Sequence, residues 1–314
     1  MNIKEILKLE NDKKIEGVYI VDTMRKVPFK DKDKGEFLAF KLFDRTGTVD
    51  AKIWKNTDEV FDKVKNGDVV KIIGASNIYR DKMSVIVMKI DVDEDYDIAK
   101  LLPASKYNPK TMFKDVCEIM DTIKDEDIMK LWIEIKNDDS FIKKFMRCPG
   151  GKGKTHHAYL HGLLEHTLSI LIILKRFAII PEADVDKMYM GGFLHDVGKI
   201  YSYKWDSNIE MTNLGRLHEH TALGYSFFMI RMSDIDMPHK KRVEIIEDIG
   251  HIILSHHDIP EFHTFVRPMT LEAKLVAQAD FFDSFQTRHR ATFEDLDEEW
   301  FYSNLDNQFF FKRK

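Results

Sequence analysis

The chain has 314 residues, of which 44% are hydrophobic and 32% charged, a balance typical of a globular protein with a real core. Its length allows two domains of ordinary size. The formal net charge of -5 and the pI near 6.2 exclude nucleic-acid binding driven by overall charge, which leaves local patches or bound metal ions.

From about Lys14 to Val92 the chain has short runs rich in Val, Ile, Phe and Tyr, and turn-forming residues lie between these runs. This pattern is typical of strands. There are five such runs: IEGVYIVDTMRKV, GEFLAFKLFD, TVDAKIW, VVKIIGASNIY and MSVIVMKIDV. Between the third and the fourth, TDEVFDKVKNG has apolar residues at helical spacing. Five strands with one helix at this place are the order of an OB-fold, so we predict a five-stranded OB-fold β-barrel over residues 1–95.

An OB-fold binds single strands by stacking bases on aromatic side chains and by following the backbone with basic ones. By strand alternation Phe37 and Phe43 share one face and Phe40 points to the other, so one of these faces is core. Core packing is therefore the simpler explanation for most of the aromatic residues. The polar segment KVPFKDKDKGE, between the first two strands, is the favoured contact region. The candidate nucleic-acid contacts are Lys30, Lys32, Lys34, Phe37, Lys41, Lys52, Trp54 and Arg80.

After an acidic and then proline-punctuated segment, which we interpret as a linker over residues 96–112, the periodicity becomes helical. We predict an all-α domain over residues 113–300 and a C-terminal tail over residues 301–314. The fold class is therefore α+β and multidomain.

The most apolar run, LSILIILKRFAII, is interrupted by Lys175 and Arg176 and is too short to span a bilayer. The chain begins without the apolar core of a secretion signal, and its two cysteines, Cys117 and Cys148, show no paired spacing. These features predict a cytoplasmic protein that does not interact with a membrane.

All 13 histidines lie in the helical part, from residue 156 onward. Imidazole is the commonest metal ligand and carboxylate its usual companion, so a cluster of both indicates a metal site. Any one of these residues alone is more simply explained by a hydrogen bond to the backbone. If that explanation held for all of these residues, five helices would each bury a polar residue at a cost in free energy and without a function. The candidates lie within or at the ends of apolar stretches: His166, His195, Asp196, His220, His256, His257 and Asp280.

This ordered set resembles that of the HD-domain metal-dependent phosphohydrolases, and HDVGK is similar to their HDxGK string. An OB-fold followed by an HD domain, with HHAYLHGLLEHT and LSHHDIPEF, resembles the YhaM-type 3′–5′ exoribonuclease family over nearly the whole chain. The resemblance implies that His166, His195, Asp196 and Asp280 hold one divalent ion. Asp196 would bridge to a second ion at His220 and His256, with His257 as a further contributor. Manganese is the first choice for both ions, and magnesium, iron or zinc also fit.

Three residues receive catalytic roles: His195, Asp196 and Lys199. If the helix continues, Lys199 shares a face with the His-Asp pair and could meet a substrate phosphate; capping of the helix C-terminus explains it equally well. The stretch GGKGKTHHAYLHG supplies phosphate-binding candidates, although a mobile surface loop accounts for its glycines and lysines as well. These candidates are Lys152, Lys154 and His157, and we leave His161 out of the ligand set.

The resemblance implies a metal-dependent phosphodiesterase that degrades single-stranded RNA from the 3′ end to nucleoside monophosphates, and that forms a homo-oligomer. The sequence itself does not distinguish RNA from single-stranded DNA, which is a further candidate substrate. One alternative is an HD-domain nucleotide or cyclic-dinucleotide phosphohydrolase with a regulatory OB domain; a missing Gly-Tyr-Pro string argues against the cyclic-dinucleotide branch. The other is a non-enzymatic single-strand-binding protein, which predicts lost ligands, whereas every expected ligand position is filled.

Overall fold

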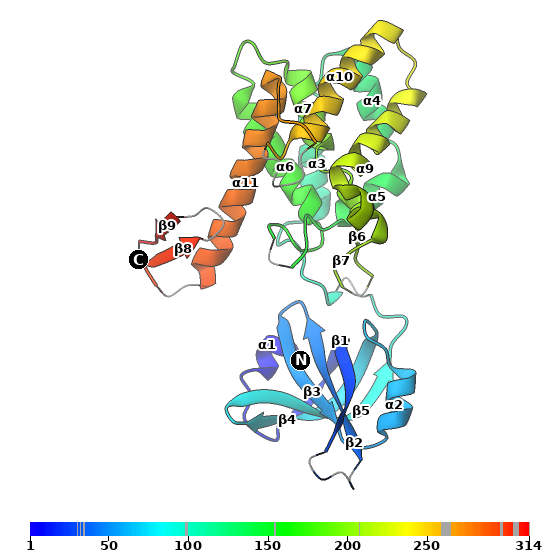
Figure 1. Ribbon diagram of the computed structural model, residues 1–314, viewed down its shortest axis with the longest axis vertical. Coiled ribbons are helices and arrows are strands. Elements are labelled where there is room, and N and C mark those ends of the chain that lie inside the picture. The colour runs from blue at the N-terminus through cyan, green and yellow to red at the C-terminus, as the bar shows by residue number, and fades with distance from the viewer. Residues whose placement is uncertain are drawn as a thin grey trace. The chain divides into compact units, whose positions relative to one another are not determined.

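The computed structural model describes residues 1–29, 31, 33, 35–97, 100–153, 155–206, 208–258, 265–295, 298–303 and 308–313. The chain divides into two compact units (Figure 1). The first is Met1–Ala104 with the short segment Trp205–Ile209, and the second is Ser105–Lys204 with Glu210–Lys314. Each unit is described by itself.

The first unit is a closed five-stranded barrel with the strand order β1-β2-β3-β5-β4. Strands β3 and β5 pair in parallel and the other neighbours pair antiparallel. A short helix lies between β3 and β4, as the sequence predicts, and the OB-fold is confirmed. The elements are α1 (Ile3–Ile6), β1 (Lys14–Pro28), β2 (Glu36–Asp44), β3 (Gly47–Ile53), α2 (Thr57–Lys63), β4 (Val69–Tyr79) and β5 (Lys82–Val92).

Alternation along β2 decides which aromatic residues fill the barrel. Leu38, Phe40 and Leu42 are buried in its core, whereas Phe37 and Phe43 are only half-buried on the outer face. Tyr19 belongs to the core as well, and its hydroxyl donates to the carbonyl of Met1 at 2.8 Å. The outer face of β2 is therefore the one that can present an aromatic ring to a ligand.

The second unit is helical, as predicted. Asn or Asp side chains cap four of its helices by accepting backbone N–H groups of the first turn, which fixes where α3, α4, α5 and α7 begin. The helices are α3 (Pro109–Met120), α4 (Glu126–Lys136), α5 (Asp139–Arg147), α6 (Gly162–Phe177), α7 (Val185–Leu194), α8 (Lys199–Ser202), α9 (Asn213–Asp234), α10 (His239–Ser255) and α11 (Leu271–Asp295).

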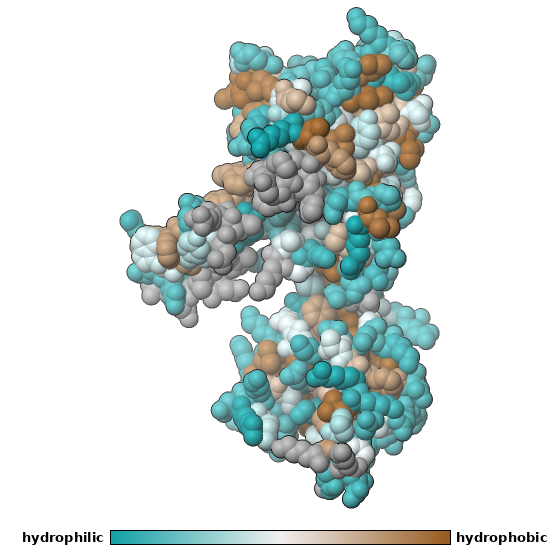
Figure 2. Space-filling view, in the orientation of Figure 1, coloured by the Kyte–Doolittle hydropathy of each residue, from teal (hydrophilic) through white to brown (hydrophobic). Residues whose placement is uncertain are grey.

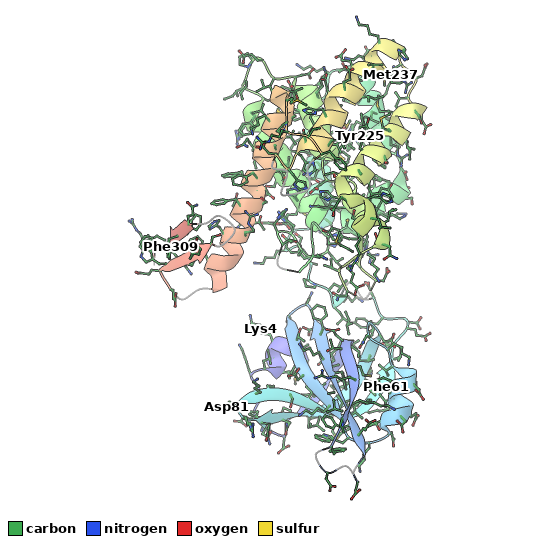
Figure 3. All side chains as sticks on the ribbon, in the orientation of Figure 1. Lys4, Phe61, Asp81, Tyr225, Met237 and Phe309 are labelled. Carbon is green, nitrogen blue, oxygen red and sulfur yellow. The ribbon has the colours of Figure 1, made fainter. Side chains whose placement is uncertain are left out.

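Two short hairpins that the sequence analysis did not anticipate lie between α8 and α9 and after α11. One joins β6 (Tyr203–Lys204) to β7 (Glu210–Met211), and the other joins β8 (Trp300–Ser303) to β9 (Gln308–Phe311). The segment expected as a C-terminal tail thus contains β9 and most of β8. Phe301 and Phe310 pack on α11 around His289, while Phe309 points away from it (Figure 3).

The core of the second unit is built on large apolar side chains from different helices. Trp132, Phe145, Phe193 and Phe228 are fully buried. Hydrophilic residues cover much of the face seen in Figure 2, with apolar patches between them. None of the helices in the described part of the chain is long and apolar enough to cross a membrane.

Candidate active site

Five helices of the second unit bring the predicted ligands together. His166 lies in the second turn of α6, and His195 and Asp196 directly follow α7. His220 lies in α9, and Asp280 lies in α11. His256 and His257 follow the end of α10. All seven residues are buried or half-buried, and His166, His195, Asp196 and His256 are at most 2% exposed.

Asp196 lies at the centre of this cluster, and its two carboxylate oxygens face different histidines. Oδ2 lies 3.3 Å from Nε2 of His166 and 3.5 Å from Nε2 of His195. Oδ1 lies 3.3 Å from Nε2 of His220 and 3.7 Å from Nε2 of His256. The site therefore has two halves that meet at one carboxylate.

Each half contains residues whose ligand atoms all lie within 4.8 Å of one another. One set is His166, His195 and Asp196, and the other is His220, His256 and His257. Asp280 belongs to the first half, because its Oδ1 lies 3.3 Å from Nε2 of His166. This spacing suits side chains that share one ion.

Outward hydrogen bonds fix which nitrogen of three rings faces the centre. Nδ1 of His195 donates to the carbonyl of Gly192 at 2.7 Å, and Nδ1 of His256 donates to that of Ile253 at 2.8 Å. Nδ1 of His166 donates to a carboxylate oxygen at 2.7 Å. Because these oxygens only accept, each ring points its Nε2 inward, the arrangement of a metal-bound histidine. The Nε2 atoms of His166 and His195 lie 3.0 Å apart, a distance that suits a shared proton or two ligands of one ion.

Two buried polar atoms at the centre lack hydrogen-bond partners among the described residues. They are Oδ1 of Asp196 and Nε2 of His256, which face each other. A buried polar atom without a partner costs about 1–3 kcal/mol. A divalent ion would supply a partner to both, and imidazole with carboxylate is a donor set suited to such an ion. The residues present therefore fit a bound metal.

The protonation states of Asp196 and His256 also suit metal binding. Burial alone would raise the pKa of Asp196, but Lys199 and His195 hold that pKa well below its ordinary value. Burial lowers the pKa of His256 well below the ordinary value, so this ring is neutral. For His166 burial is outweighed by hydrogen bonds to Asp196, Asp280 and Asp283, which raise its pKa.

The sequence analysis missed Asp283, which holds the first half of the site in place. Its carboxylate accepts from Nδ1 of His166 at 2.7 Å, from Nε2 of His157 at 2.8 Å and from the hydroxyl of Ser169. Its position three residues after Asp280 places both on one face of α11, a signal that was present in the sequence.

His157, a predicted phosphate contact, is buried and engaged at both ring nitrogens. Nε2 bonds to Asp283, and Nδ1 lies 2.9 Å from the hydroxyl of Tyr159. This leaves neither nitrogen for a phosphate. Lys152 lies exposed in the same loop, and Lys154 lies outside the described residues.

The glycine of HDVGK has a packing role. A Cβ on Gly198 would lie 1.9 Å from the carbonyl oxygen of His220 and 2.5 Å from the amide nitrogen of Gly224, so α9 reaches the site only because this side chain is absent. Glu219, with φ 59° and ψ 155°, kinks α9 directly before His220. Lys199 begins α8, is 6% exposed, and places its Nζ 2.6 Å from Oδ2 of Asp196.

On the barrel, three aromatic rings form a cluster that we call the aromatic platform: Phe29, Phe37 and Trp54. Their ring centroids lie 5.1–5.4 Å apart. Trp54 is 42% exposed, and Nζ of Lys52 lies 5.9 Å from the centre of its ring. The platform contains two predicted contacts, Phe37 and Trp54, with the predicted contact Lys52 beside it, and adds Phe29, which lies in the segment KVPFKDKDKGE.

The other predicted contacts of the barrel are placed differently. Lys41 lies opposite Asp50 in the register of β2 and β3. It lines a separate depression together with Lys82. Arg80 lies at the turn between β4 and β5, with its guanidinium 5.3 Å from the ring centre of Tyr79. Figure 3 shows the neighbouring Asp81 far from Phe61 of α2. Lys30, Lys32 and Lys34 lie outside the described residues.

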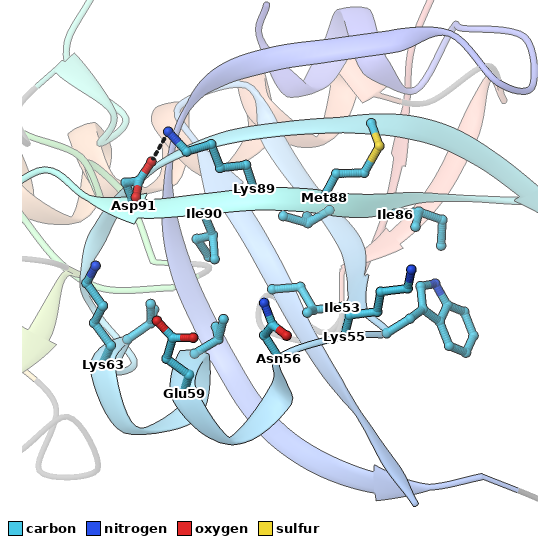
Figure 4. A pocket seen from close by; sticks show the side chains of 14 residues that line it. Ile53, Lys55, Asn56, Glu59, Lys63, Ile86, Met88, Lys89, Ile90 and Asp91 are labelled. Carbon is cyan, nitrogen blue, oxygen red and sulfur yellow. Dashed lines mark ion pairs between the residues drawn. The ribbon is translucent and has the colours of Figure 1, made fainter. Parts of the chain in front are cut away.

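A groove of about 570 Å³ between α2 and β5 continues from Trp54 (Figure 4). Lys55 and Lys63 line it with the exposed side chain of Met88. Lys89 lies there too, but pairs with Asp91 at 3.0 Å. The groove thus joins basic and apolar side chains beside an exposed indole, features that suit a single strand, although Glu59 and Asp91 line it as well.

Comparisons with known proteins agree with this architecture. The family profile described as "HD domain" matches residues 163–284, and the one described as "OB-fold nucleic acid binding domain" matches residues 18–93. Curated relatives named 3′-5′ exoribonuclease YhaM, from Bacillus velezensis and Bacillus licheniformis, are each 27% identical over 254 residues. The match covers 79% of this chain and 78% of each relative.

Among solved structures, the second OB-fold domain of replication protein A from Methanococcus maripaludis matches with 23% identity and a TM-score of 0.25. It covers 31% of this chain and 99% of that one. The chain combines an OB-fold with an HD domain, and its resemblance to the YhaM-type family is confirmed.

Proposed function

Because the chain resembles the YhaM-type exoribonucleases in both of its domains, we propose that it is a metal-dependent 3′–5′ exoribonuclease. It removes nucleoside monophosphates from the 3′ end of single-stranded RNA, and single-stranded DNA is a further substrate. The observation that carries the proposal is the buried Asp196, whose two oxygens face two sets of histidines. RNA as substrate and the direction of attack follow from the names of the relatives.

The proposed ligand set uses both halves of the site. His166, His195, Asp196 and Asp280 would hold one ion, Asp196 would bridge, and His220 and His256 would hold a second ion with His257. Bound ions supply an activated water and stabilise negative charge on the phosphate oxygens. Manganese is the first choice, and iron and zinc suit an imidazole-rich site better than magnesium does.

Lys199 and Asp196 act as a pair in this proposal. The buried ammonium, 2.6 Å from the carboxylate, keeps Asp196 ionised and orients it. The same ammonium places a positive charge beside the position of the scissile phosphate, where it favours the developing charge of the transition state.

The barrel would bind the strand. Bases stack on the aromatic platform, and Lys52, Lys55 and Lys63 follow the phosphates. The loop with Lys30, Lys32 and Lys34, together with Lys41 and Arg80, remains part of the proposed interface. A cytoplasmic location and a homo-oligomeric state complete the proposal.

The test is digestion of a 5′-labelled single-stranded RNA, with manganese and then with chelator. We expect a ladder that shortens from the 3′ end for the wild type and no product with chelator or for Asp196→Ala. Asp248→Ala is the matched control, because this carboxylate pairs with Lys187 at 2.7 Å in another part of the unit. Immediate release of the labelled nucleotide would contradict the direction. RNA that stays intact with manganese would refute the proposal, and nucleotides and cyclic dinucleotides would be tried next.

A further inference from the structure

His156 is a half-buried imidazole beside the site that the ligand set above does not use. Its ring centroid lies 5.5 Å from that of His166. His156, His166 and Asp280 each offer a ligand atom, and these atoms lie within 4.8 Å of one another. No hydrogen bond joins the His156 side chain to the residues that the structure describes, whereas both ring nitrogens of His157 are engaged.

The loop before α6 holds His156 in this orientation. The backbone of His157 is left-handed, with φ 52°, and its carbonyl accepts from the amide of Gly150 at 2.9 Å. A Cβ on Gly162 would lie 2.0 Å from the same carbonyl oxygen, so the loop packs directly on the start of α6. The His157 side chain is tied to Asp283 at 2.8 Å. With its neighbour held by backbone and side chain, His156 is directed toward His166 and Asp280.

We propose that His156 is a further ligand of the ion held by His166 and Asp280, which adds a loop residue to a site otherwise built from helices. Metal–nitrogen and metal–oxygen bonds of about 2.0–2.2 Å place two ligand atoms at most about 4.4 Å apart. The observed limit of 4.8 Å needs only a small contraction around an ion. The inference rests on the proposed metal centre.

Manganese binding tests the inference without reference to catalysis. We compare the wild type with His156→Ala, with His156→Gln as the more conservative variant, and with His218→Ala, which removes an exposed histidine of α9. Calorimetric titration with manganese should show one of the ions bound about 10-fold or more weakly in both His156 variants. Pulsed electron paramagnetic resonance should show one fewer nitrogen coupled to manganese. The His218→Ala protein should match the wild type in both measurements.

Unchanged affinity and an unchanged nitrogen count in the His156 variants would overturn the inference. Digestion of RNA by the same proteins keeps the two proposals separate. A wild type that binds manganese through His156 but leaves RNA intact would refute the exoribonuclease proposal alone. A wild type that degrades RNA, with variants that bind manganese normally, would refute the ligand role of His156 alone.

Discussion

Asp283 orients a ligand through hydrogen bonds. It fixes Nδ1 of His166 at 2.7 Å and so turns Nε2 of that ring toward Asp196. We expect Asp283→Asn to weaken manganese binding by about 10- to 100-fold, the usual effect of losing the partner of a metal-bound histidine. Calorimetric titration measures this, and Asp248→Asn is the control. Wild-type affinity in the Asp283 variant would show that the helices alone orient His166.

Gly198 controls the position of a second ligand through its size. A methyl group there would lie 1.9 Å from the carbonyl oxygen of His220, which is backbone and cannot rotate away. We expect Gly198→Ala to lower the free energy of unfolding by about 1–3 kcal/mol, as overpacking does, and to weaken metal binding. Gly192→Ala is the matched control, since its Cβ would come close to the movable Cδ1 of Leu174 at 2.4 Å and would meet Ile170 and Leu171 at ordinary contact distances of 3.5 and 3.7 Å. Urea unfolding measures the free energy of unfolding of both variants. An equal decrease in both would show that the contact with the backbone of His220 does not matter.

At the scale of elements, one carboxylate both starts α5 and ties it to α9. Asp138 accepts from the amide of Phe141 at 2.9 Å and pairs with Arg231. These two contacts lower the pKa of Asp138, in that order of importance. The ionised form is therefore favoured in the folded state. The stabilisation is present above the unfolded-state pKa of about 3.9 and is lost as the pH falls through the lower folded-state pKa.

We expect Asp138→Ala to lower the free energy of unfolding by about 1–2 kcal/mol at pH 7, the usual cost of an N-cap. Asp138→Asn keeps an acceptor for the cap but loses the charge, so its deficit should shrink as the pH falls below about 4. Urea unfolding at pH 7, 5 and 3 measures both variants, with the exposed Asp139→Asn as control. A deficit of Asp138→Asn that is the same at all three pH values would contradict the pKa argument.

Elements with a strong local pattern were predictable from the sequence, and those set by tertiary contacts were not. The five strands alternate and the helices are periodic, so the OB-fold and the helical half follow from the sequence. The ligand candidates stood out because they interrupt apolar stretches. The hairpins of two to four residues per strand carry too little pattern, and the kink at Glu219 depends on how α9 packs on Gly198. The engagement of His157 by Asp283 joins residues far apart in the chain.

At the scale of the whole molecule, the net charge of -5 means that the proposed RNA substrate would have to be bound by a local surface. Stacking on one aromatic ring contributes about 1–3 kcal/mol per base, so Trp54→Ala should raise KM for RNA by about 5- to 150-fold. Hydrolysis of bis(p-nitrophenyl) phosphate, which is too small to need the platform, should be unchanged. Added salt should likewise raise KM for RNA alone.

Steady-state kinetics with RNA and with bis(p-nitrophenyl) phosphate tests whether Trp54 acts on RNA binding alone. Tyr107→Ala, which removes an exposed aromatic ring of the second unit, is the matched control and should leave KM for RNA near the wild-type value. Asp196→Ala should abolish hydrolysis of both substrates. A Trp54→Ala protein that loses activity on the small diester would show that Trp54 acts on the catalytic unit and not on the strand.

The order of the site along the chain has a consequence for synthesis on the ribosome. The barrel is encoded first, and the residues that cluster around Asp196 run from His156 to Asp283. Because domains generally fold as they emerge, the barrel can form while the helical unit is incomplete. Without α11 the first half of the site lacks both Asp280 and its support from Asp283. On the proposed function, a nascent chain would therefore bind RNA before it could hydrolyse it.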